Sequence, residues 1–341
     1  MVVVDTDIAI IGGGVQGLFL AYYAKIKFPD KKVSLFEAGA VGSGITAYSG
    51  HLHTHIGAGD KYHLVETSLK LYKELLTTYP DFPIEQREFL GVCHRDNLDA
   101  TLSQFTKKPL IGSRADYPFL NLGSDYHVLS GLSAYVTKRS LVNFMLEIVA
   151  AIGVKIHEGN YIQNLAWHSG RYHFSNQYDI EHSASVVLNA TGKSIFSWLD
   201  ESVIKLRAKK VVAFHIDRLD SPANSIYYFF DDDAFLLPQP CYNRFLFSYR
   251  CEDWDVDVSL DRHLINDTDL KTARKVLDKY SVGLSDHILG GQASVDIYNT
   301  PESSPLIHQV GYNYFVIGAT GGSGVRLAPA LATMTLDRIT I

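Results

Sequence analysis

The 341-residue sequence lacks several features that would place it in particular functional classes. It has no basic block and a formal net charge of −6, so a nucleic-acid partner is not expected. It has no apolar run of the roughly 18–20 residues that a spanning helix needs, and acidic Asp5 and Asp7 precede its first apolar run, unlike a signal peptide. Its three cysteines (Cys93, Cys241 and Cys251) show no C-x-x-C spacing and no disulfide framework. We therefore expect a protein of a reducing compartment, the cytoplasm.

A glycine-rich stretch, IAIIGGGVQGLFLAYYAKI, stands at residues 8–26. Residues 8–11 predict a buried strand, the glycines fit G-x-G-x-x-G, and residues 18–26 are helical in character. A second strand is predicted at 32–36, and Glu37 follows it, 20 residues after Gly17. Strand, glycine loop, helix, strand and acid together favour a dinucleotide site over a structural turn.

Each position of this unit has a physical reason. Gly12 permits the tight turn, Gly14 lets a pyrophosphate approach the backbone, and Gly17 lets the helix lie close to the strand. The free N–H groups and the positive dipole end of the helix favour phosphate. Glu37 can accept hydrogen bonds from both ribose hydroxyls, and it would repel a 2′-phosphate.

Two later stretches favour FAD over NAD. Residues 186–189 predict a buried strand that ends in the small-residue turn Ala190-Thr191-Gly192. Residues 314–317 predict another strand, which runs into GATGGSGVRLAP. A nicotinamide domain needs only the first glycine loop, whereas a larger cofactor lying across the sheet needs a second one.

The sequence resembles the D-amino-acid-oxidase-like superfamily of FAD-dependent oxidoreductases, which includes sarcosine and glycine oxidases, glycerol-3-phosphate dehydrogenase and L-2-hydroxyglutarate oxidase. The resemblance is carried by IIGGGVQG with Glu37, GSGITAYSGHLHTHIG, GVKIHEGNYIQNL, VLNATG, PQPCYNRFLFSYRCEDWD and GATGGSGVRLAPALA. It implies an α/β fold, with a Rossmann-like FAD-binding domain at 1–59, 131–205 and 296–341. A discontinuous antiparallel-sheet substrate (cap) domain is implied at 60–130 and 206–295.

The resemblance also implies which residues hold FAD. The segment 42–50 would wrap the pyrophosphate, the strand near Ile162 would meet the adenine, and the last glycine loop would meet the pyrimidine edge of the flavin. A helix beginning near Val325 would aim its N-terminus at the flavin N1–C2=O and favour the anionic reduced form. The implied cofactor-binding residues are Gly12, Gly14, Val15, Gln16, Gly17, Glu37, Ala38, Ser43, Gly44, Thr46, Ser49, Gly50, Ile162, Ala190, Thr191, Gly192, Gly321, Gly322, Ser323, Gly324 and Val325.

Two residues are implied in catalysis by the same resemblance. Arg326 matches the basic residue that grips the substrate carboxylate in sarcosine oxidases, and an arginine fork suits a carboxylate. His53 matches a position beside the flavin in hydroxyglutarate oxidases, where a histidine could take a hydroxyl proton as hydride leaves.

His51, His53 and His55 alternate, and His63 follows. On a strand the first three would share one face, which could form a metal site. No carboxylate or cysteine completes such a site at close spacing, so we expect no metal. Contact with flavin or substrate, with His51 as a candidate, and ordinary polar packing remain the alternatives.

The sequence departs from its relatives before the last strand. Where D-amino-acid oxidases carry a carboxylate-binding arginine it offers residues 292–294, QAS, and where sarcosine oxidases carry the cysteine that attaches FAD it has a residue near Val295. We therefore expect non-covalent FAD and a substrate other than a plain D-amino acid.

The expected cap contains the strand candidates KVVAFHI, SIYYFF, AFLLPQP and RFLFSYR, with the acidic run 231–233 as a hairpin turn. Its aromatic residues are mostly core, and Tyr228, Tyr249 and Arg250 are candidates for substrate contact. Helical periodicity in HLVETSLKLYKELLTTY and LVNFMLEIVAAIG predicts two covering helices.

The sequence thus predicts an FAD-dependent oxidase or dehydrogenase that passes hydride from a small amine or amino acid, carrying a carboxylate, to flavin N5. Oxygen or another acceptor would reoxidise the flavin. The alternatives are a 2-hydroxy-acid oxidase or dehydrogenase, a biosynthetic enzyme acting on an unusual or carrier-bound substrate, and a flavin-binding protein without turnover.

Overall fold

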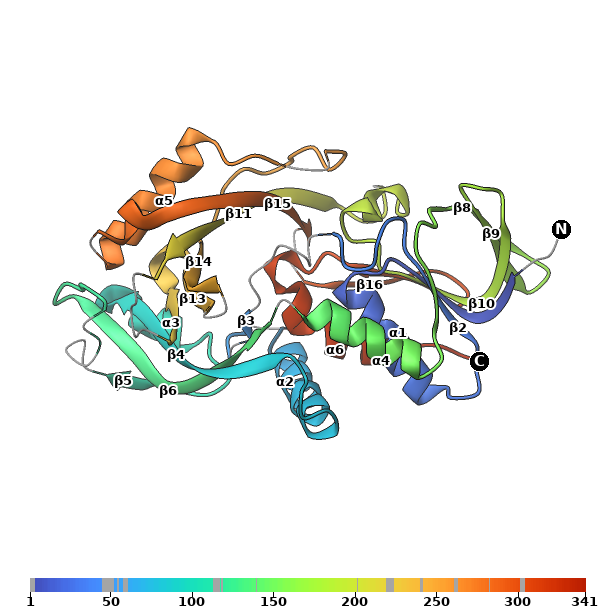
Figure 1. Ribbon diagram of the computed structural model, residues 1–341, viewed down its shortest axis with the longest axis horizontal. Coiled ribbons are helices and arrows are strands. Elements are labelled where there is room, and N and C mark those ends of the chain that lie inside the picture. The colour runs from blue at the N-terminus through green and yellow to red at the C-terminus, as the bar shows by residue number, and fades with distance from the viewer. Residues whose placement is uncertain are drawn as a thin grey trace.

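The computed structural model describes residues 4–44, 52–53 (backbone only), 55–57, 61–112, 117, 119–138, 140–200, 202–218, 224–239, 242–260, 263–281, 283–300 and 304–341. Two sheets lie side by side along the long axis of the molecule, and both chain ends lie at the same end (Figure 1). No helix among these residues combines the length and the apolar character needed to cross a membrane.

The first sheet is built around parallel strands, as the N-terminal unit predicts. Its strand order is β16-β17-β10-β1-β2-β7, and β9 joins β10 to β8. The strands are β1 (Val4–Ile11), β2 (Val33–Phe36), β7 (Lys155–His157), β8 (Ile162–His168), β9 (Arg171–Asn176), β10 (Glu181–Asn189), β16 (Leu306–Gly311) and β17 (Tyr314–Gly318).

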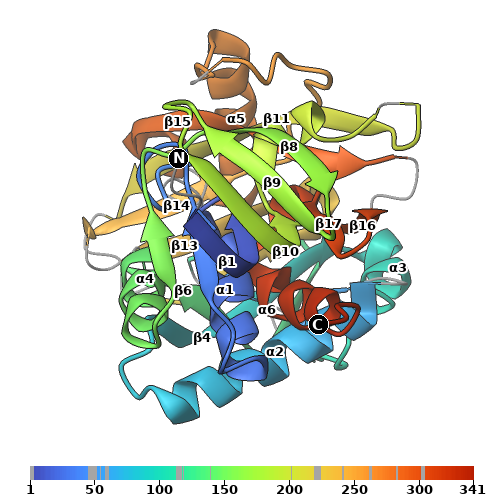
Figure 2. The same ribbon diagram turned by 90° about the vertical axis from the view of Figure 1, so that its right-hand side faces the viewer.

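The helices α1 (Val15–Lys27), α4 (Leu141–Ala151) and α6 (Gly324–Leu336) cover one face of this sheet (Figure 2). The helix α2 (Lys61–Thr78) packs against α6. Strands β1, β2, β10 and β17 are buried on both faces, which explains their nearly unbroken apolar runs.

The second sheet has the order β15-β11-β14-β13-β12-β4-β6-β3, with β5 paired to β6. Its strands are β3 (Leu52–His53), β4 (Ile84–His94), β5 (Leu110–Gly112), β6 (Tyr126–Thr137), β11 (Leu206–Asp217), β12 (Ile226–Phe229), β13 (Ala234–Gln239), β14 (Arg244–Ser248) and β15 (Ile288–Asn299). Helix α5 (Asp267–Tyr280) packs on one face, and the short helix α3 (Leu98–Leu102) lies against β4. The four predicted cap strands become β11 to β14, and the acidic run closes the β12–β13 hairpin.

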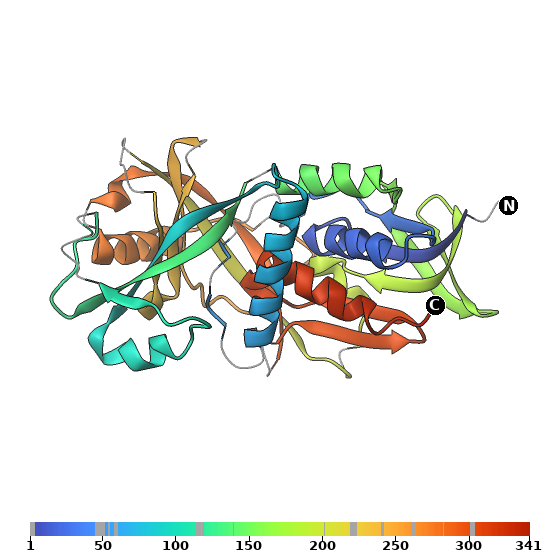
Figure 3. The same cartoon turned by 90° about the horizontal axis from the view of Figure 1, so that it is seen from below.

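Two expectations about the boundary between the halves differ from the structure. The predicted boundary at residue 130 falls inside β6, which pairs with β4 over its whole length, so residues 131–137 join the second sheet. Helix α2, expected in the cap, instead packs against α1 and α6 (Figure 3). Its Tyr72 is fully buried, meets the Phe19 ring edge-on at 5.6 Å, and donates a hydrogen bond to Val325 O at 2.7 Å.

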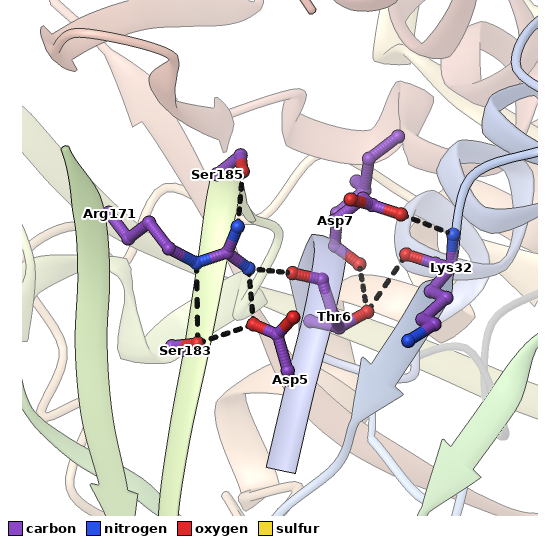
Figure 4. Close-up of polar contacts among 8 residues, drawn as sticks. Asp5, Thr6, Asp7, Lys32, Arg171, Ser183 and Ser185 are labelled. Atoms are coloured by element: carbon purple, nitrogen blue, oxygen red, sulfur yellow. Dashed lines mark hydrogen bonds and ion pairs between the residues drawn. The ribbon is translucent and has the colours of Figure 1, made fainter. Parts of the chain in front are cut away.

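Arg171 fixes the start of β1 relative to β9 and β10 (Figure 4). Its guanidinium donates to Asp5 Oδ1 at 2.5 Å, Thr6 O at 2.6 Å and Ser185 Oγ at 2.9 Å. Ser183 Oγ donates to the same Asp5 oxygen at 2.6 Å. Because one planar fork joins three strands, it holds the register of the strand that leads into the first glycine loop.

His182 and His157 pack around Phe36, the last residue of β2. Phe36 stacks on the His157 ring at 4.6 Å, and Phe174 stacks on the His182 ring at 5.4 Å. Among the described residues, neither ring nitrogen of His182 has a hydrogen-bond partner. Burial lowers the pKa of both imidazoles, since a charged ring there would lose its hydration.

This pair predicts a pH dependence of stability. In the unfolded chain a histidine takes up a proton as pH falls below its usual pKa of about 6.5, whereas folded His182 resists protonation. The stability that neutral His182 contributes is therefore complete above that pH and is lost as pH falls. Between pH 6.5 and 5, the free energy of unfolding of the His182→Phe variant should therefore fall less steeply than that of the wild type. The difference in slope is at most about 1.4 kcal/mol per pH unit.

The measurement is the free energy of unfolding of both proteins from pH 7.5 to 5. The comparison with wild type is needed because Asp296, whose pKa burial raises to about 7, changes the stability in the opposite direction over this range. His168→Phe, at an exposed position, is the matched control and should keep the wild-type slope. Parallel slopes for wild type and His182→Phe would contradict the assignment.

Candidate active site

The first glycine loop brings β1, α1 and β10 into contact. Gly12 has φ +106°, and a β-carbon there would lie 2.5 Å from Ala190 O. A β-carbon on Gly17 would lie 1.8 Å from Gly12 O, so the first turn of α1 rests directly on the end of β1. Neither position can hold a side chain without movement of the backbone.

The amino end of α1 is open to an anion. Its N-cap is Gly14, which gives no side-chain cap, and its first turn contains no acidic residue. No acidic side chain of the first turn therefore compensates the positive dipole end of this helix. Gln16 anchors this turn to α6 by donating from Nε2 to Ala328 O at 3.3 Å, while its buried Oε1 has no partner in the described part of the chain.

Glu37 lies beside this loop at the end of β2. Its carboxylate accepts hydrogen bonds from Gly13 N at 2.6 Å and from Gly39 N at 2.9 Å. Asn160 N donates to Glu37 O at 2.8 Å, which brings the segment before Ile162 alongside the acid. Glu37, predicted to bind the ribose, and the strand near Ile162, predicted to meet the adenine, are therefore neighbours.

The second glycine loop connects β17 to α6. Residues Gly321–Ser323 form a single 3₁₀ turn, and α6 then begins at Gly324 without a side-chain cap or an acidic residue in its first turn. A β-carbon on Gly321 would lie 2.4 Å from the Tyr298 ring, so the loop packs flat against β15. This free helix end is the second anion-favouring position of the site.

Arg326 lies in the first turn of α6 and is partly buried. It donates from Nη1 to Ile56 O at 3.0 Å and from Nη2 to Ser323 Oγ at 2.6 Å. Its buried Nε has no partner, and no carboxylate oxygen lies within 4.0 Å of its nitrogens, among the residues that the structure describes. Burial lowers the pKa of the guanidinium, while Tyr228 and Asp233 act in the opposite direction.

The second sheet supplies tyrosines whose pKa values are raised, one of which influences Arg326. Tyr228 on β12 donates a short hydrogen bond to Asp233 Oδ1. The pKa of Tyr228 is raised well above its usual value by burial and by Asp233, and Arg326 opposes this shift. The pKa of Tyr298 on β15 is also raised, first by burial and next by Asp296. The charges of Asp233 and Arg326 therefore act on Tyr228 in opposite directions.

Asp296 is a buried acid beside the second glycine loop that sequence reasoning missed. It is 9% exposed on β15, and Oδ2 lies 3.4 Å from where a β-carbon on Gly322 would be. Burial raises its pKa to about 7, and Lys209, its cross-strand partner on β11, acts against this rise. The sequence did contain a signal for it, because an acidic residue within the stretch SVDIY, among apolar neighbours, indicates a buried carboxyl group.

The whole-chain comparisons agree with this geometry. The family model described as FAD dependent oxidoreductase (DAO) matches residues 7–338. The chain belongs to this family of FAD-dependent oxidoreductases.

Solved structures of other proteins show the same fold. Glycine oxidase from Geobacillus kaustophilus aligns with a TM-score of 0.81 at 15% identity, over 99% of this chain and 96% of that one. L-proline dehydrogenase from P. horikoshii aligns with a TM-score of 0.83 at 16% identity, over 98% of this chain and 93% of that one. L-alpha-glycerophosphate oxidase from Mycoplasma pneumoniae, with FAD bound, aligns with a TM-score of 0.82 at 15% identity, over 97% of this chain and 94% of that one. No curated protein sequence matches the chain.

The residues of the oxidoreductase fit FAD on structural grounds. Both glycine loops exclude a β-carbon from the protein side, and both helix ends are uncapped. Gly192 has φ +59° and nothing within 4 Å of its β-carbon position, so the backbone of the turn after β10 borders open space. Gln16 Oε1 and Arg326 Nε are buried polar atoms that a ligand can satisfy.

The structure brings together most of the residues expected to bind FAD. Gly42 N donates to Gly13 O at 3.0 Å, which places the segment with exposed Ala38, Ser43 and Gly44 beside the first loop. Thr191 donates from Oγ1 to Asn189 Oδ1 at 2.8 Å. Ile162 is buried in the core below β2. Thr46, Ser49, Gly50 and His51 lie outside the described residues.

The predicted catalytic histidine is described only in its backbone. Leu52 and His53 pair with Val136 and Tyr135 as strand β3, which borders the second sheet. His55 lies partly buried, with Nδ1 3.4 Å from Thr106 Oγ1. Burial, with help from Lys107 and Lys73, lowers the pKa of His55.

Tyr249 does not face the site, contrary to its selection as a substrate contact. It lies under α5, where its hydroxyl donates to Asp269 O at 3.1 Å and its ring stacks on Phe214 at 6.3 Å. The α5 face of the sheet therefore buries it in the cap core. Arg250, the next residue, is half-exposed and donates from Nε to Glu252 Oε1 at 2.6 Å.

One group of possible metal ligands occurs among the described residues. Cys251, Asp253 and Asp269 bring ligand atoms within 4.8 Å of one another. The buried ammonium of Lys210 lies 2.6 Å from Asp269 and 3.7 Å from Asp253. A lysine therefore already supplies the positive charge there.

The first glycine loop yields a test with a matched control. Gly12→Ala should weaken FAD binding at least about ten-fold, because the methyl group would press on Ala190 O and shift the loop. Gly170→Ala changes a glycine with φ +81° that has open space around it, so it adds backbone strain but no collision. Titrating apoprotein into FAD and following flavin fluorescence gives both affinities. Equal losses in the two variants would contradict the proposed role of the close contact.

Proposed function

We propose that this FAD-dependent oxidoreductase oxidises a small amine or amino acid that carries a carboxylate, with transfer of hydride to flavin N5. Arg326 carries the proposal. It is a partly buried cation beside the second glycine loop, with an unpartnered Nε and no carboxylate within 4.0 Å among the described residues. A guanidinium in this state favours an anionic ligand, and its planar fork matches a carboxylate.

The contacts of Arg326 support a role in orientation. Ile56 O and Ser323 Oγ hold Nη1 and Nη2, so the side chain is positioned before any ligand arrives. Ser323 belongs to the loop beside the flavin edge, so a carboxylate gripped by Arg326 would lie next to the redox centre. Fixing the substrate there supplies the proximity on which hydride transfer depends.

We propose that FAD lies along the first sheet without a covalent bond. Gly12, Gly14, Gly17 and the α1 terminus would hold the pyrophosphate, and Glu37 would bind the ribose. The 321–325 loop and the α6 terminus would hold the pyrimidine edge. Strand β15 contains neither cysteine nor histidine, and the free cysteines Cys93 and Cys251 are buried. When bound, FAD supplies the hydride-accepting centre.

The comparisons favour an amine over a 2-hydroxy acid. A neutral amine can lose hydride without a separate base, whereas an alcohol needs one, and His53 stays the predicted base for an alcohol. Glycine oxidase and L-proline dehydrogenase share the fold, by name acting on amino acids, although the glycerophosphate oxidase shows that the fold also serves an alcohol. Cytoplasmic location and oxygen or another electron acceptor remain predictions from the sequence.

The cofactor proposal predicts that the purified protein is yellow. Acid precipitation should leave FAD in the supernatant and a colourless pellet, measured from the flavin spectrum of each fraction. Flavin that stays with the precipitated protein would contradict non-covalent binding.

The substrate proposal predicts a graded effect at Arg326. With an amino acid that reduces the flavin, Arg326→Met should lower kcat/KM by roughly 10- to 150-fold, since a charged hydrogen bond contributes about 1.5–3 kcal/mol. Arg326→Lys keeps the charge but loses the fork, so its loss should be smaller. Anaerobic flavin reduction in a stopped-flow instrument separates binding from the chemical step. Wild-type kinetics in Arg326→Met would remove this residue from the site.

A further inference from the structure

Asp296 is a buried carboxyl group that has no polar partner. It is 9% exposed on β15. Among the described residues none donates a hydrogen bond to it, and no ammonium or guanidinium lies within 4.0 Å of it. Buried carboxylates normally have such partners, because an ionised group without them loses its hydration. Two ways remain to avoid an unpaired buried charge, namely a proton on the carboxyl group or a ligand beside it.

The carboxyl group lies against the second glycine loop. Asp296 Oδ2 is 3.4 Å from the position that a β-carbon on Gly322 would occupy, which is ordinary contact. Tyr298 packs against Gly321 in the same way, with its ring 2.4 Å from the corresponding position. Because alternate residues of a strand share one face, β15 presents Asp296 and Tyr298 to the loop together. Asp296 therefore touches the backbone that we propose to border the flavin.

The cation nearest in the sheet interacts with other groups. Lys209 on β11 is the cross-strand partner of Asp296. Its buried ammonium lies 4.9 Å from the centre of the Trp254 ring and 3.9 Å from Glu252 Oε2, and it forms no ion pair with Asp296. Lys209 thus acts on Asp296 through its charge but does not neutralise it by direct contact.

The other elements packed against this part of β15 bring few charges. The turn Gly321–Ser323 contains no ionisable residue. The 3₁₀ helix Gly192–Ser197 contributes Lys193, whose ammonium donates to Leu260 O at 2.7 Å. Tyr298 stays neutral because burial raises its pKa. Burial therefore has the larger effect on Asp296 and raises its pKa to about 7, with Lys209 opposing this rise.

Reduction of a flavin beside this loop would change the charge that Asp296 meets. Two electrons and one proton convert FAD to its anionic reduced form, so the site gains one negative charge. A negative charge nearby raises the pKa of a carboxyl group. At pH values between the pKa of Asp296 in the oxidised enzyme and that in the reduced enzyme, the group is ionised before reduction and protonated after it. The coupling is reciprocal, so a proton on the carboxyl group favours reduction to the same extent.

We propose that Asp296 takes up one proton when the flavin is reduced and releases it when the flavin is reoxidised. A carboxylate oxygen forms an O–H bond with a proton from solvent, in addition to the proton that the flavin itself takes up. This inference rests on the proposed function, because it requires the flavin to lie beside the second glycine loop. The competing interpretation is that Asp296 keeps one protonation state and only packs against Gly322.

The midpoint potential of the bound flavin separates the two interpretations. It is measured against reference dyes from pH 6 to 9.5, with dithionite as the reductant, so the result does not depend on the substrate. Asp296→Asn keeps the shape of the side chain but cannot ionise. The potentials of wild type and variant should coincide at the acid end, where Asp296 is neutral in both redox states. At the alkaline end the variant should be easier to reduce, by at least about ten-fold in the reduction equilibrium, or about 30 mV.

A control variant and a spectrum accompany this measurement. Glu252→Gln removes an exposed carboxylate from the solvent side of Lys209 and should keep the wild-type pH dependence. The reduced-minus-oxidised infrared spectrum of the wild type, recorded just above pH 7, should show loss of a carboxylate band and gain of a protonated carboxyl band. Both bands should be absent in Asp296→Asn.

The outcomes distinguish this inference from the cofactor proposal. Parallel potentials of wild type and Asp296→Asn over the whole pH range would overturn the inference, while the bound flavin would still support the cofactor site. A protein that binds no FAD overturns both. Should Asp296→Asn fail to fold, Lys209→Gln provides the test, because it removes the charge that opposes protonation of Asp296. It must move the infrared change on reduction to higher pH, or the inference fails.

Discussion

The architecture depends on one backbone contact, where α1 crosses the end of β1. At Gly17 the helix approaches the strand so closely that a β-carbon would lie 1.8 Å from Gly12 O. This contact aims the uncapped N-terminus of α1 past Gly14 and leaves Gly12 against Ala190. The helix dipole, the acid at Glu37 and the turn after β10 can act on one ligand because all of them meet at this crossing.

The local parts of this site could be predicted from the sequence because each depends on a few adjacent residues. Gly12 to Gly17, the strand after them and Glu37 form a unit of fixed length. Its glycines adopt backbone conformations and close contacts that residues with a side chain cannot adopt. The second loop was recognisable for the same reason. The comparisons confirm the family and the fold that these motifs imply.

The candidate site residues on the second sheet depend instead on pairing between distant segments. Asp296 meets Lys209 only because β15 pairs with β11, and Tyr298 lies under Gly321 because of that same register. Tyr228 and Tyr249 looked equivalent in sequence, yet they pack in different clusters of the cap, Tyr228 against Phe89 and Phe230 and Tyr249 under α5. The boundary inside β6 was misplaced because a long strand carries no signal for which sheet it will join.

The second sheet also connects Tyr298, which packs against the last glycine loop, to Tyr228 beside the acidic turn. From Tyr298 on β15 the hydrogen-bonded ladder runs through β11, β14 and β13 to Tyr228 on β12. A sheet resists the shear that would change such a spacing, so these two tyrosines keep a fixed separation that connecting loops alone would not impose.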